Sequence, residues 1–198
     1  MSGPTLLIGL SGYAGSGKDE AAKVLVAGGW RRDAFADRLR DFLYALNPLI
    51  PGHVGAGNLR LANVVDAYGW DAAKRTFPEM RQLLQRCGTE AGRQVLGSNV
   101  WVDALMRDFK PGTEALVVTD VRFPNEADAI RKAGGVIVRI ERPGVGPNTA
   151  PDGTVHQSDV ALDGYDFDVV VQNDGDVTDL HERLLGTALL INLKALTA

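Results

Sequence analysis

The sequence predicts an α/β fold in which a parallel β-sheet lies between layers of helices, a three-layer sandwich with a helical insertion. Short, continuously apolar runs such as Thr5 to Leu10 are typical of strands buried on both faces of a parallel sheet. Segments of helical period separate these runs, which gives a repeated β-α-β order. A chain of 198 residues is long enough for one such domain, so we expect a single domain over residues 1–198.

The first third of the chain holds two predicted strands and two predicted helices. The strands are Thr5 to Leu10 and Trp30 to Phe35, and the helices are Asp19 to Ala27 and Asp37 to Leu46. Asn47-Pro48 ends the second helix, because proline cannot continue it. We expect the following segment, Pro48 to Asn58, to be a loop.

The middle of the chain, Leu59 to Phe109, carries only helical signals. The predicted helices are Ala62 to Tyr68, Asp71 to Phe77, Glu79 to Leu96 and Val100 to Phe109. Residues 48–111 are therefore expected to form a helical insertion in a core made of residues 1–47 and 112–198.

The last third returns to strands, predicted at Glu114 to Thr119, Val136 to Ile140 and Val169 to Val171. Helices are expected at Glu126 to Ala133 and from Val177 onward. The connection over residues 143–159 is long and rich in Gly, Pro, Asn and Asp, a length and composition often found in lids.

Composition narrows the functional classes. The apolar fraction of 45%, the charged fraction of 23% and the formal charge of -4 suit a globular protein and disfavour binding of polymeric nucleic acid. No run approaches the roughly 18 apolar residues that a membrane span requires. Cys87 is the only cysteine, so no intramolecular disulfide can form. We expect a cytoplasmic protein with no membrane partner.

Gly12-Tyr-Ala-Gly-Ser-Gly-Lys18 matches the phosphate-binding pattern Gly-x-x-x-x-Gly-Lys, between an apolar strand and a helix as the mechanism requires. Backbone N–H groups of such a loop converge on phosphate oxygens, and the lysine reaches the β- and γ-phosphates. The residues expected to bind the nucleotide here are Gly12, Ala14, Gly15, Ser16, Gly17 and Lys18. The structural alternative is a glycine-rich turn with an exposed lysine.

Asp19 occupies the position where this loop commonly has Ser or Thr to hold Mg²⁺. A carboxylate can also hold this metal, directly or through water. Alternatively, Asp19 only complements the dipole at the start of the helix.

Ala115-Leu-Val-Val-Thr-Asp120 is an apolar strand that ends in an acid, with Arg122 two residues further on. At the carboxyl end of a parallel sheet, Asp120 would orient Mg²⁺ and Arg122 would neutralise charge on a phosphoryl group in transfer. The alternative is a turn with an exposed Asp–Arg pair.

Four polar residues recur at four-residue spacing in the insertion: Arg81, Gln85, Thr89 and Arg93. Leu84, Cys87, Ala91 and Val95 would then line another, apolar face of the helix. Paired arginines with Gln and Thr between them suit an acceptor phosphate and a base edge, although a solvated helix face is the usual explanation.

The lid region and the last strand offer weaker candidates. Arg139 and Arg142 could bring positive charge over the γ-phosphate when the lid closes, or be surface charges. His156 is expected to be structural, and Ser158 or Asp159 to cap a helix. Asn173-Asp-Gly175 could contact adenine, although a turn and helix cap is favoured.

Together these segments resemble the deoxynucleoside monophosphate kinases of bacteriophages, over nearly the whole chain. The specific segments are Gln85-Arg-Cys-Gly-Thr-Glu90 and Asp120-Val-Arg-Phe-Pro-Asn-Glu126; the others include Phe35-Ala-Asp-Arg-Leu-Arg40, Val100-Trp101 and Asn173-Asp-Gly175. The resemblance implies a P-loop kinase fold whose insertion binds the acceptor.

The resemblance further implies ATP and Mg²⁺ as cofactors, a deoxynucleoside monophosphate (dNMP) as acceptor, and a homodimer. The implied residues at the transfer centre are Lys18, Asp120, Arg122 and Arg142, with Asp19 and Asp120 at the metal and Asn173 at the nucleotide. The implied acceptor site comprises Phe35, Arg38, Arg81, Gln85, Thr89, Arg93 and Trp101.

Two other interpretations remain open at this point. One is a related small-molecule kinase with dephospho-coenzyme A or phosphomevalonate as acceptor. The other is a non-catalytic P-loop protein, either a GTP switch or a structural or regulatory protein whose P-loop only stabilises the fold. A switch usually carries an Asn-Lys-x-Asp segment, which this sequence lacks.

Overall fold

A computed structural model describes residues 6–52, 57–149, 153–155 and 157–197 of the chain. The chain forms two compact units. Unit 1 comprises Met1–Ala34 and Leu105–Ala198, and unit 2 comprises Phe35–Ala104. The predicted insertion, residues 48–111, lies mainly in unit 2.

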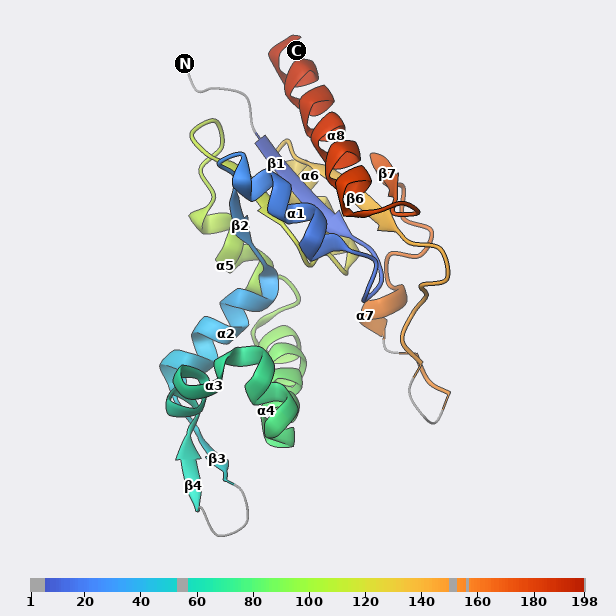
Figure 1. The fold of residues 1–198 in the computed structure, drawn as a ribbon. Helices are drawn as coiled ribbons and strands as arrows, with labels where there is room; N and C mark the ends of the chain where they lie inside the picture. The colour runs from blue at the N-terminus through green and yellow to red at the C-terminus, as the bar shows by residue number, and fades with distance from the viewer. Residues whose placement is uncertain (1–5, 53–56, 150–152, 156, 198) are drawn as a thin grey trace. The chain divides into compact units, whose positions relative to one another are not determined.

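Unit 1 contains a five-stranded sheet of order β2-β5-β1-β6-β7, in which every neighbouring pair is parallel. Its strands are β1 (Leu6–Ser11), β2 (Arg31–Asp33), β5 (Ala115–Val118), β6 (Val136–Glu141) and β7 (Val169–Gln172). β1 is the middle strand (Figure 1). The predicted parallel α/β fold is confirmed.

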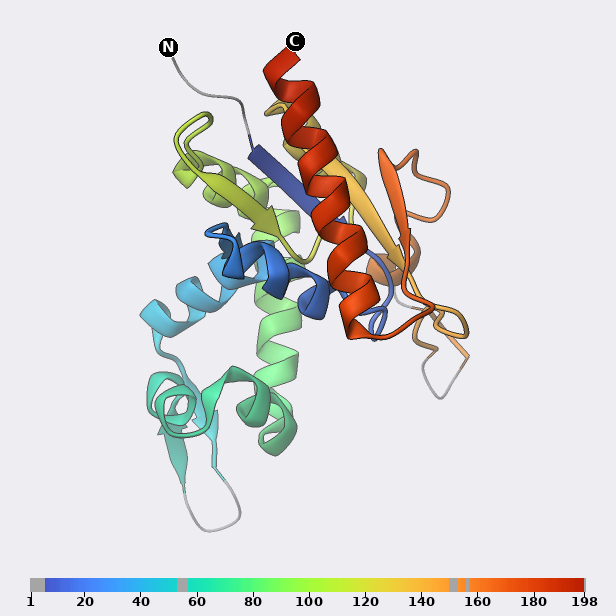
Figure 2. The ribbon, with the colours of Figure 1, turned by 45° about the horizontal axis from the view of Figure 1, so that its top comes forward.

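Helices cover both faces of this sheet. Figure 2 shows α1 (Lys18–Ala27) and α8 (Val177–Thr197) on the same face. There, Leu25 of α1 and Leu184 of α8 join a core cluster with Ile8 and Val138. On the other face, α6 (Pro124–Lys132) places Ile130 so close to Gly9 of β1 that a side chain at Gly9 would collide with it.

Two further helices contain residues of unit 1. α7 (Gln157–Val160) is a single turn at the end of the predicted lid, and α5 (Val100–Asp108) spans the division between the units. In the part of the chain that the structure describes, no helix combines the length and apolarity that crossing a membrane would require.

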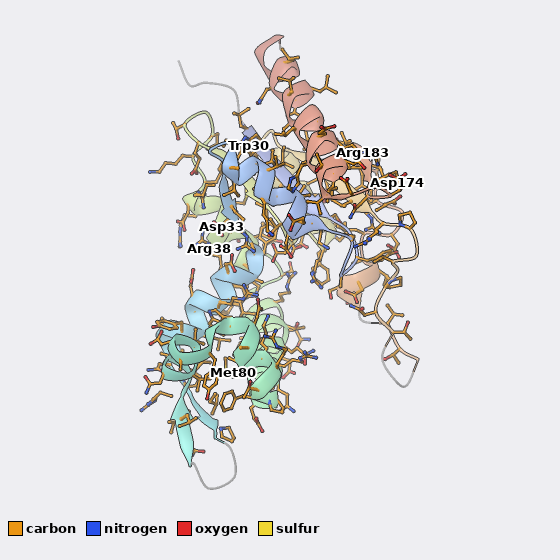
Figure 3. All side chains as sticks on the ribbon, viewed as in Figure 1. Trp30, Asp33, Arg38, Met80, Asp174 and Arg183 are labelled. Carbon is orange, nitrogen blue, oxygen red and sulfur yellow. The ribbon has the colours of Figure 1, made fainter. Side chains whose placement is uncertain are left out.

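Unit 2 is mainly helical. It contains α2 (Phe35–Leu46), an antiparallel pair β3 (Leu49–Pro51) and β4 (Asn58–Arg60), α3 (Leu61–Thr76), α4 (Pro78–Gln85) and a π-helix, η1 (Arg86–Leu96). Its core includes Leu43, Ile50 and Met80, the last labelled in Figure 3. Gly69, with a φ of 71°, interrupts α3 between the two helices predicted there.

Two predictions for unit 2 are wrong. The segment predicted as a loop, Pro48 to Asn58, includes β3, because Ile50 is buried in the core of unit 2. The helix predicted over Glu79 to Leu96 changes to π-helical hydrogen bonding at Arg86. A π-helix has more residues per turn than an α-helix, so Val95 turns away from the predicted apolar face and is 76% exposed.

Candidate active site

The phosphate loop connects β1 to α1. Gly12, Gly15 and Gly17 have φ values of 143°, 82° and 100°, backbone conformations that glycine adopts without strain. A side chain at Gly12 would also lie 2.4 Å from the carbonyl oxygen of Ile140. The loop therefore requires glycine for both its conformation and its close approach to β6. Ala14 and Gly15 are exposed at its tip.

Lys18 folds back over this loop. Its ammonium group donates hydrogen bonds to the carbonyl oxygens of Gly12, at 2.6 Å, and Tyr13, at 2.7 Å. Burial, followed by the nearby positive charge of Arg122, lowers the pKa of Lys18 to about 8. The lysine is thus held where a phosphate would meet both its charge and the loop.

A hydrogen bond from Asn173 holds the phosphate loop at Ser16. Ser16 is 1% exposed, and its hydroxyl has no hydrogen-bond partner among the described residues. The Asn173 amide, at the end of β7, donates to the carbonyl oxygen of Ser16 at 2.9 Å. That bond favours a role for Asn173 in holding the loop, while the unpaired Ser16 hydroxyl fits a phosphate oxygen.

The two carboxylates predicted to hold the metal both act on Lys18. The negative charges of Asp19, in the first turn of α1, and Asp120, beyond β5, each raise its pKa and partly offset the effect of burial. Asp19 also lines an open hollow of about 310 Å³ together with Thr119, whose hydroxyl is buried and has no partner among the described residues. Oxygen donors of this kind suit Mg²⁺.

Arg122 follows β5 and is held at two points. Its backbone N–H donates to the buried carboxylate of Glu126 at 2.7 Å, and its guanidinium group is 3.4 Å from Asp159 of α7. Asp159 lies inside the turn of α7, which begins at Gln157, so the prediction that Asp159 or Ser158 caps a helix is wrong. His156 lies outside the described residues.

Arg139 is named from the sequence only beside Arg142, and it is not placed among the predicted catalytic residues. It lies on β6, is 6% exposed, and stacks over the ring of Tyr13 in the phosphate loop. Arg139, Arg122 and Gly12 line one small hollow. Nothing local in the sequence marks Arg139 as buried, since the rings beside it come from other parts of the chain. Arg142, the lid arginine that we favoured, is exposed.

In unit 2, the predicted acceptor residues lie on several helices. Arg81 and Gln85 are exposed on α4, whereas Thr89 and Arg93 lie on η1, exposed and half-buried respectively. The change from α- to π-helical geometry at Arg86 falls in the middle of this stripe, so its four-residue spacing is not continuous. π-Helical segments often occur at functional sites.

The other predicted acceptor residues of unit 2 are more buried. Trp101 is 8% exposed, and its indole N–H donates to the carbonyl oxygen of Gly88 at 2.9 Å. Phe35 is 2% exposed at the start of α2, and Arg38, labelled in Figure 3, is 3.5 Å from Asp41 one turn further on. Packing alone accounts for the position of Trp101, which favours a structural role.

Comparison with known proteins adds independent information. A family model for deoxynucleotide monophosphate kinase matches residues 70–184. A protein of Acanthamoeba polyphaga mimivirus, provisionally named a deoxynucleotide monophosphate kinase, is 30% identical over 202 residues, which cover 91% of this chain and 94% of the relative.

Two phage enzymes are more distant relatives. The deoxynucleoside-5'-monophosphate kinase of Escherichia phage T5 is 26% identical, with 65% of this chain and 72% of the relative covered. The deoxynucleotide monophosphate kinase of Enterobacteria phage T4 is 29% identical, with 54% and 44% covered. The family model spans more than half of the chain and the mimivirus relative nearly all of it, and the chain belongs to the deoxynucleotide monophosphate kinase family.

Proposed function

We propose that this chain transfers the γ-phosphate of ATP to a dNMP, giving ADP and a deoxynucleoside diphosphate. The observation that carries the proposal is Lys18, a partly buried cation held over a glycine loop in a member of this kinase family. In the reaction, the bond from the γ-phosphorus to the bridging oxygen breaks, and its electron pair stays on ADP. A phosphate oxygen of the acceptor forms the new bond, and since this oxygen is already ionised, no general base is required.

The residues of the phosphate loop suit the ATP side of the reaction. Backbone N–H groups of the loop, the ammonium of Lys18 and the hydroxyl of Ser16 would bind the phosphates. Asp19 and Asp120 would hold Mg²⁺, which when bound supplies positive charge to the β- and γ-phosphates. Arg122, together with Arg142 in the lid, would stabilise the charge that spreads over the phosphoryl oxygens in the transition state.

We assign the acceptor to the unit 2 residues Phe35, Arg38, Arg81, Gln85, Thr89, Arg93 and Trp101. Arginine forms paired hydrogen bonds to phosphate, and Gln and Thr both donate and accept, so these types suit a nucleotide phosphate and its base. Unit 2 would then be the acceptor-binding part of one kinase domain. The resemblance to phage kinases also favours a homodimer in the cytoplasm. Light scattering of the purified protein would test whether the dimer forms.

A coupled assay of ADP release tests the function. With ATP and Mg²⁺, we expect turnover with one or more of dGMP, dTMP and dAMP. The same assay with ribonucleotides, dephospho-coenzyme A and phosphomevalonate defines the acceptor class. Turnover only with one of the last two would overturn the proposal, whereas equal use of dGMP and GMP would overturn only its deoxy selectivity.

The Lys18→Ala variant tests whether the reaction uses the phosphate loop. Lys18 would contact the phosphates of bound ATP and bind them more tightly in the transition state, so its loss should lower kcat by at least about 10³-fold without unfolding the protein. Near-normal turnover in this variant would show that the reaction does not use the phosphate loop.

A further inference from the structure

We propose that Arg139 is a catalytic residue that contacts the phosphoryl group during transfer, and that Tyr13 and Phe167 are positioning residues that fix its guanidinium group. This inference rests on the proposed kinase function. It adds a buried strand residue to Arg122 and Arg142, the two arginines already proposed to stabilise the phosphoryl group.

Burial is the first argument. Arg139 is 6% exposed, and its ion pairs are long, at 3.6 Å to Asp163 and 4.0 Å to Glu141. Both distances exceed those of a hydrogen bond, and the side chains of both acids are partly exposed to water. A guanidinium group carries five N–H donors, and burying such a charge is unfavourable unless it is well paired. A phosphoryl group would provide the close, charged acceptors that these two acids do not.

Aromatic stacking is the second argument. The guanidinium carbon of Arg139 lies 4.5 Å from the ring centre of Tyr13 and 5.4 Å from that of Phe167. The Tyr13 hydroxyl in turn donates to Asp163 at 2.8 Å, which fixes the ring. Stacking uses the face of a guanidinium group and leaves the N–H donors at its edge to bind an anion. Tyr13 directly follows Gly12 in the phosphate loop. The guanidinium group of Arg139 therefore packs directly against a residue of this loop.

Charge is the third argument. Arg139 lines the same small hollow as Gly12, Ala14 and Arg122. The ammonium group of Lys18 is hydrogen-bonded to the carbonyl oxygen of Gly12, which lines this hollow, so three cations lie close together beside the loop. Like charges repel one another, and this arrangement is therefore stabilised by an anion that carries several negative charges. Such an anion is present when a γ-phosphate meets an acceptor phosphate.

The test compares Arg139→Lys and Arg139→Gln with wild type in the ADP-release assay. We expect kcat to fall at least about tenfold in Arg139→Lys, which keeps the charge but loses the planar fork. In Arg139→Gln we expect a fall of about 10²- to 10³-fold, with KM for ATP within about threefold of wild type.

Arg131→Gln is the matched control. Arg131 also lies over a tyrosine ring, 4.9 Å from the centre of Tyr165, and pairs with an aspartate, Asp168, at 3.1 Å. It does not line the hollow. We expect this variant to lose stability in thermal unfolding while its kcat stays within about threefold of wild type.

Phe167→Leu separates positioning from folding. If Phe167 acts through Arg139, this substitution should lower kcat several-fold in wild type and have almost no further effect in Arg139→Gln. Equal effects of Phe167→Leu in both backgrounds would overturn the positioning role.

Two other results would overturn the catalytic role of Arg139 alone: unchanged kcat in Arg139→Lys, or a raised KM for the dNMP with unchanged kcat. Wild-type protein that is inactive with every dNMP would instead overturn the proposed function, and this inference with it.

Discussion

The carboxylate of Glu126 accepts the backbone N–H of Arg122 at 2.7 Å and that of Phe123 at 3.0 Å. Glu126 is 2% exposed, whereas the two hydrogen bonds that its carboxylate accepts are partly buried. The carboxylate therefore fixes the backbone at the point where Arg122 leaves the end of β5. A residue in the first turn of α6 thus holds the backbone of a predicted catalytic residue.

We predict that Glu126→Ala lowers the free energy of unfolding by about 1–3 kcal/mol, because it leaves two partly buried N–H groups without this acceptor. It should also lower kcat, since the segment that carries Arg122 loses its support. Glu126→Gln keeps one carbonyl oxygen and should retain most of the activity. Urea unfolding and steady-state kinetics measure the two effects.

Asp128→Ala is the control for this prediction. Asp128 lies on the same helix and accepts an exposed hydrogen bond from Tyr165 at 2.9 Å. Loss of a solvent-exposed bond should change stability by less than about 1 kcal/mol. If Glu126→Ala were as stable as Asp128→Ala, the buried carboxylate would not be supporting the loop.

Arg122→Lys tests whether Arg122 acts in transfer. A lysine keeps the positive charge but cannot form two parallel hydrogen bonds to phosphoryl oxygens, so we expect kcat to fall at least about tenfold. Asp159→Asn, which weakens the 3.4 Å ion pair while keeping Arg122, provides the comparison. If kcat of Arg122→Lys stays within about threefold of wild type, Arg122 serves only as a partner of Asp159.

Gly92 of η1 tests the packing of unit 2. The Cβ of an alanine at this position would lie 2.7 Å from the ring of Trp101 and 2.7 Å from the carbonyl oxygen of Cys87. We expect Gly92→Ala to destabilise the protein by about 1–3 kcal/mol, as overpacking of a filled core does. Chemical denaturation followed by tryptophan fluorescence would report the loss.

Gly186→Ala is the contrasting variant. Gly186 lies within α8, and an alanine Cβ there would have no neighbouring atom within 4 Å. The same substitution should therefore stabilise the protein, by roughly 0.5–1 kcal/mol, through helix propensity alone. Two glycine-to-alanine changes with the same sign would contradict the packing described for Gly92.

Local patterns explain why much of unit 1 could be predicted. β1, the phosphate loop and α1 are consecutive, and each carries its own signal: an apolar run, glycines at fixed spacing and a helical period. β5 and β6 are likewise buried apolar runs, so their period and composition identify them. The parallel order of these strands then follows from the helices between them.

Long-range packing explains what could not be predicted. Ile50 of β3 is buried in a core formed by α2, α3 and α4. A local sequence pattern does not reveal this packing, so the strand is not predicted. The π-helical hydrogen bonding of η1 accompanies the packing of Gly92 under Trp101, a residue on the next helix. Arg139 is buried by Tyr13 and Phe167, which are far from it in the sequence.

We predict that the pKa of Lys18 makes the binding of ATP sensitive to pH. Burial and the charge of Arg122 lower this pKa from 10.5 to about 8. Below about pH 8 the lysine is protonated in both the folded and the unfolded state, so the folded protein bears the full cost of burying its charge. As the pH rises from about 8 to 10.5, the folded protein holds fewer protons at this site than the unfolded chain, so its stability rises over this window.

A bound polyphosphate should reverse the effect, because its negative charge favours protonated Lys18 and raises the pKa again. Affinity for ATP should then be constant below about pH 8 and fall by up to about tenfold per unit above it. Calorimetric titration at several pH values, in buffers of different ionisation enthalpy, should show proton uptake on binding near pH 8. Lys18→Met removes the titrating group, so ATP should bind it more weakly and without this proton uptake. The same uptake in Lys18→Met would assign the titration to another group, and an affinity that rises with pH in wild type would contradict contact between Lys18 and the phosphates.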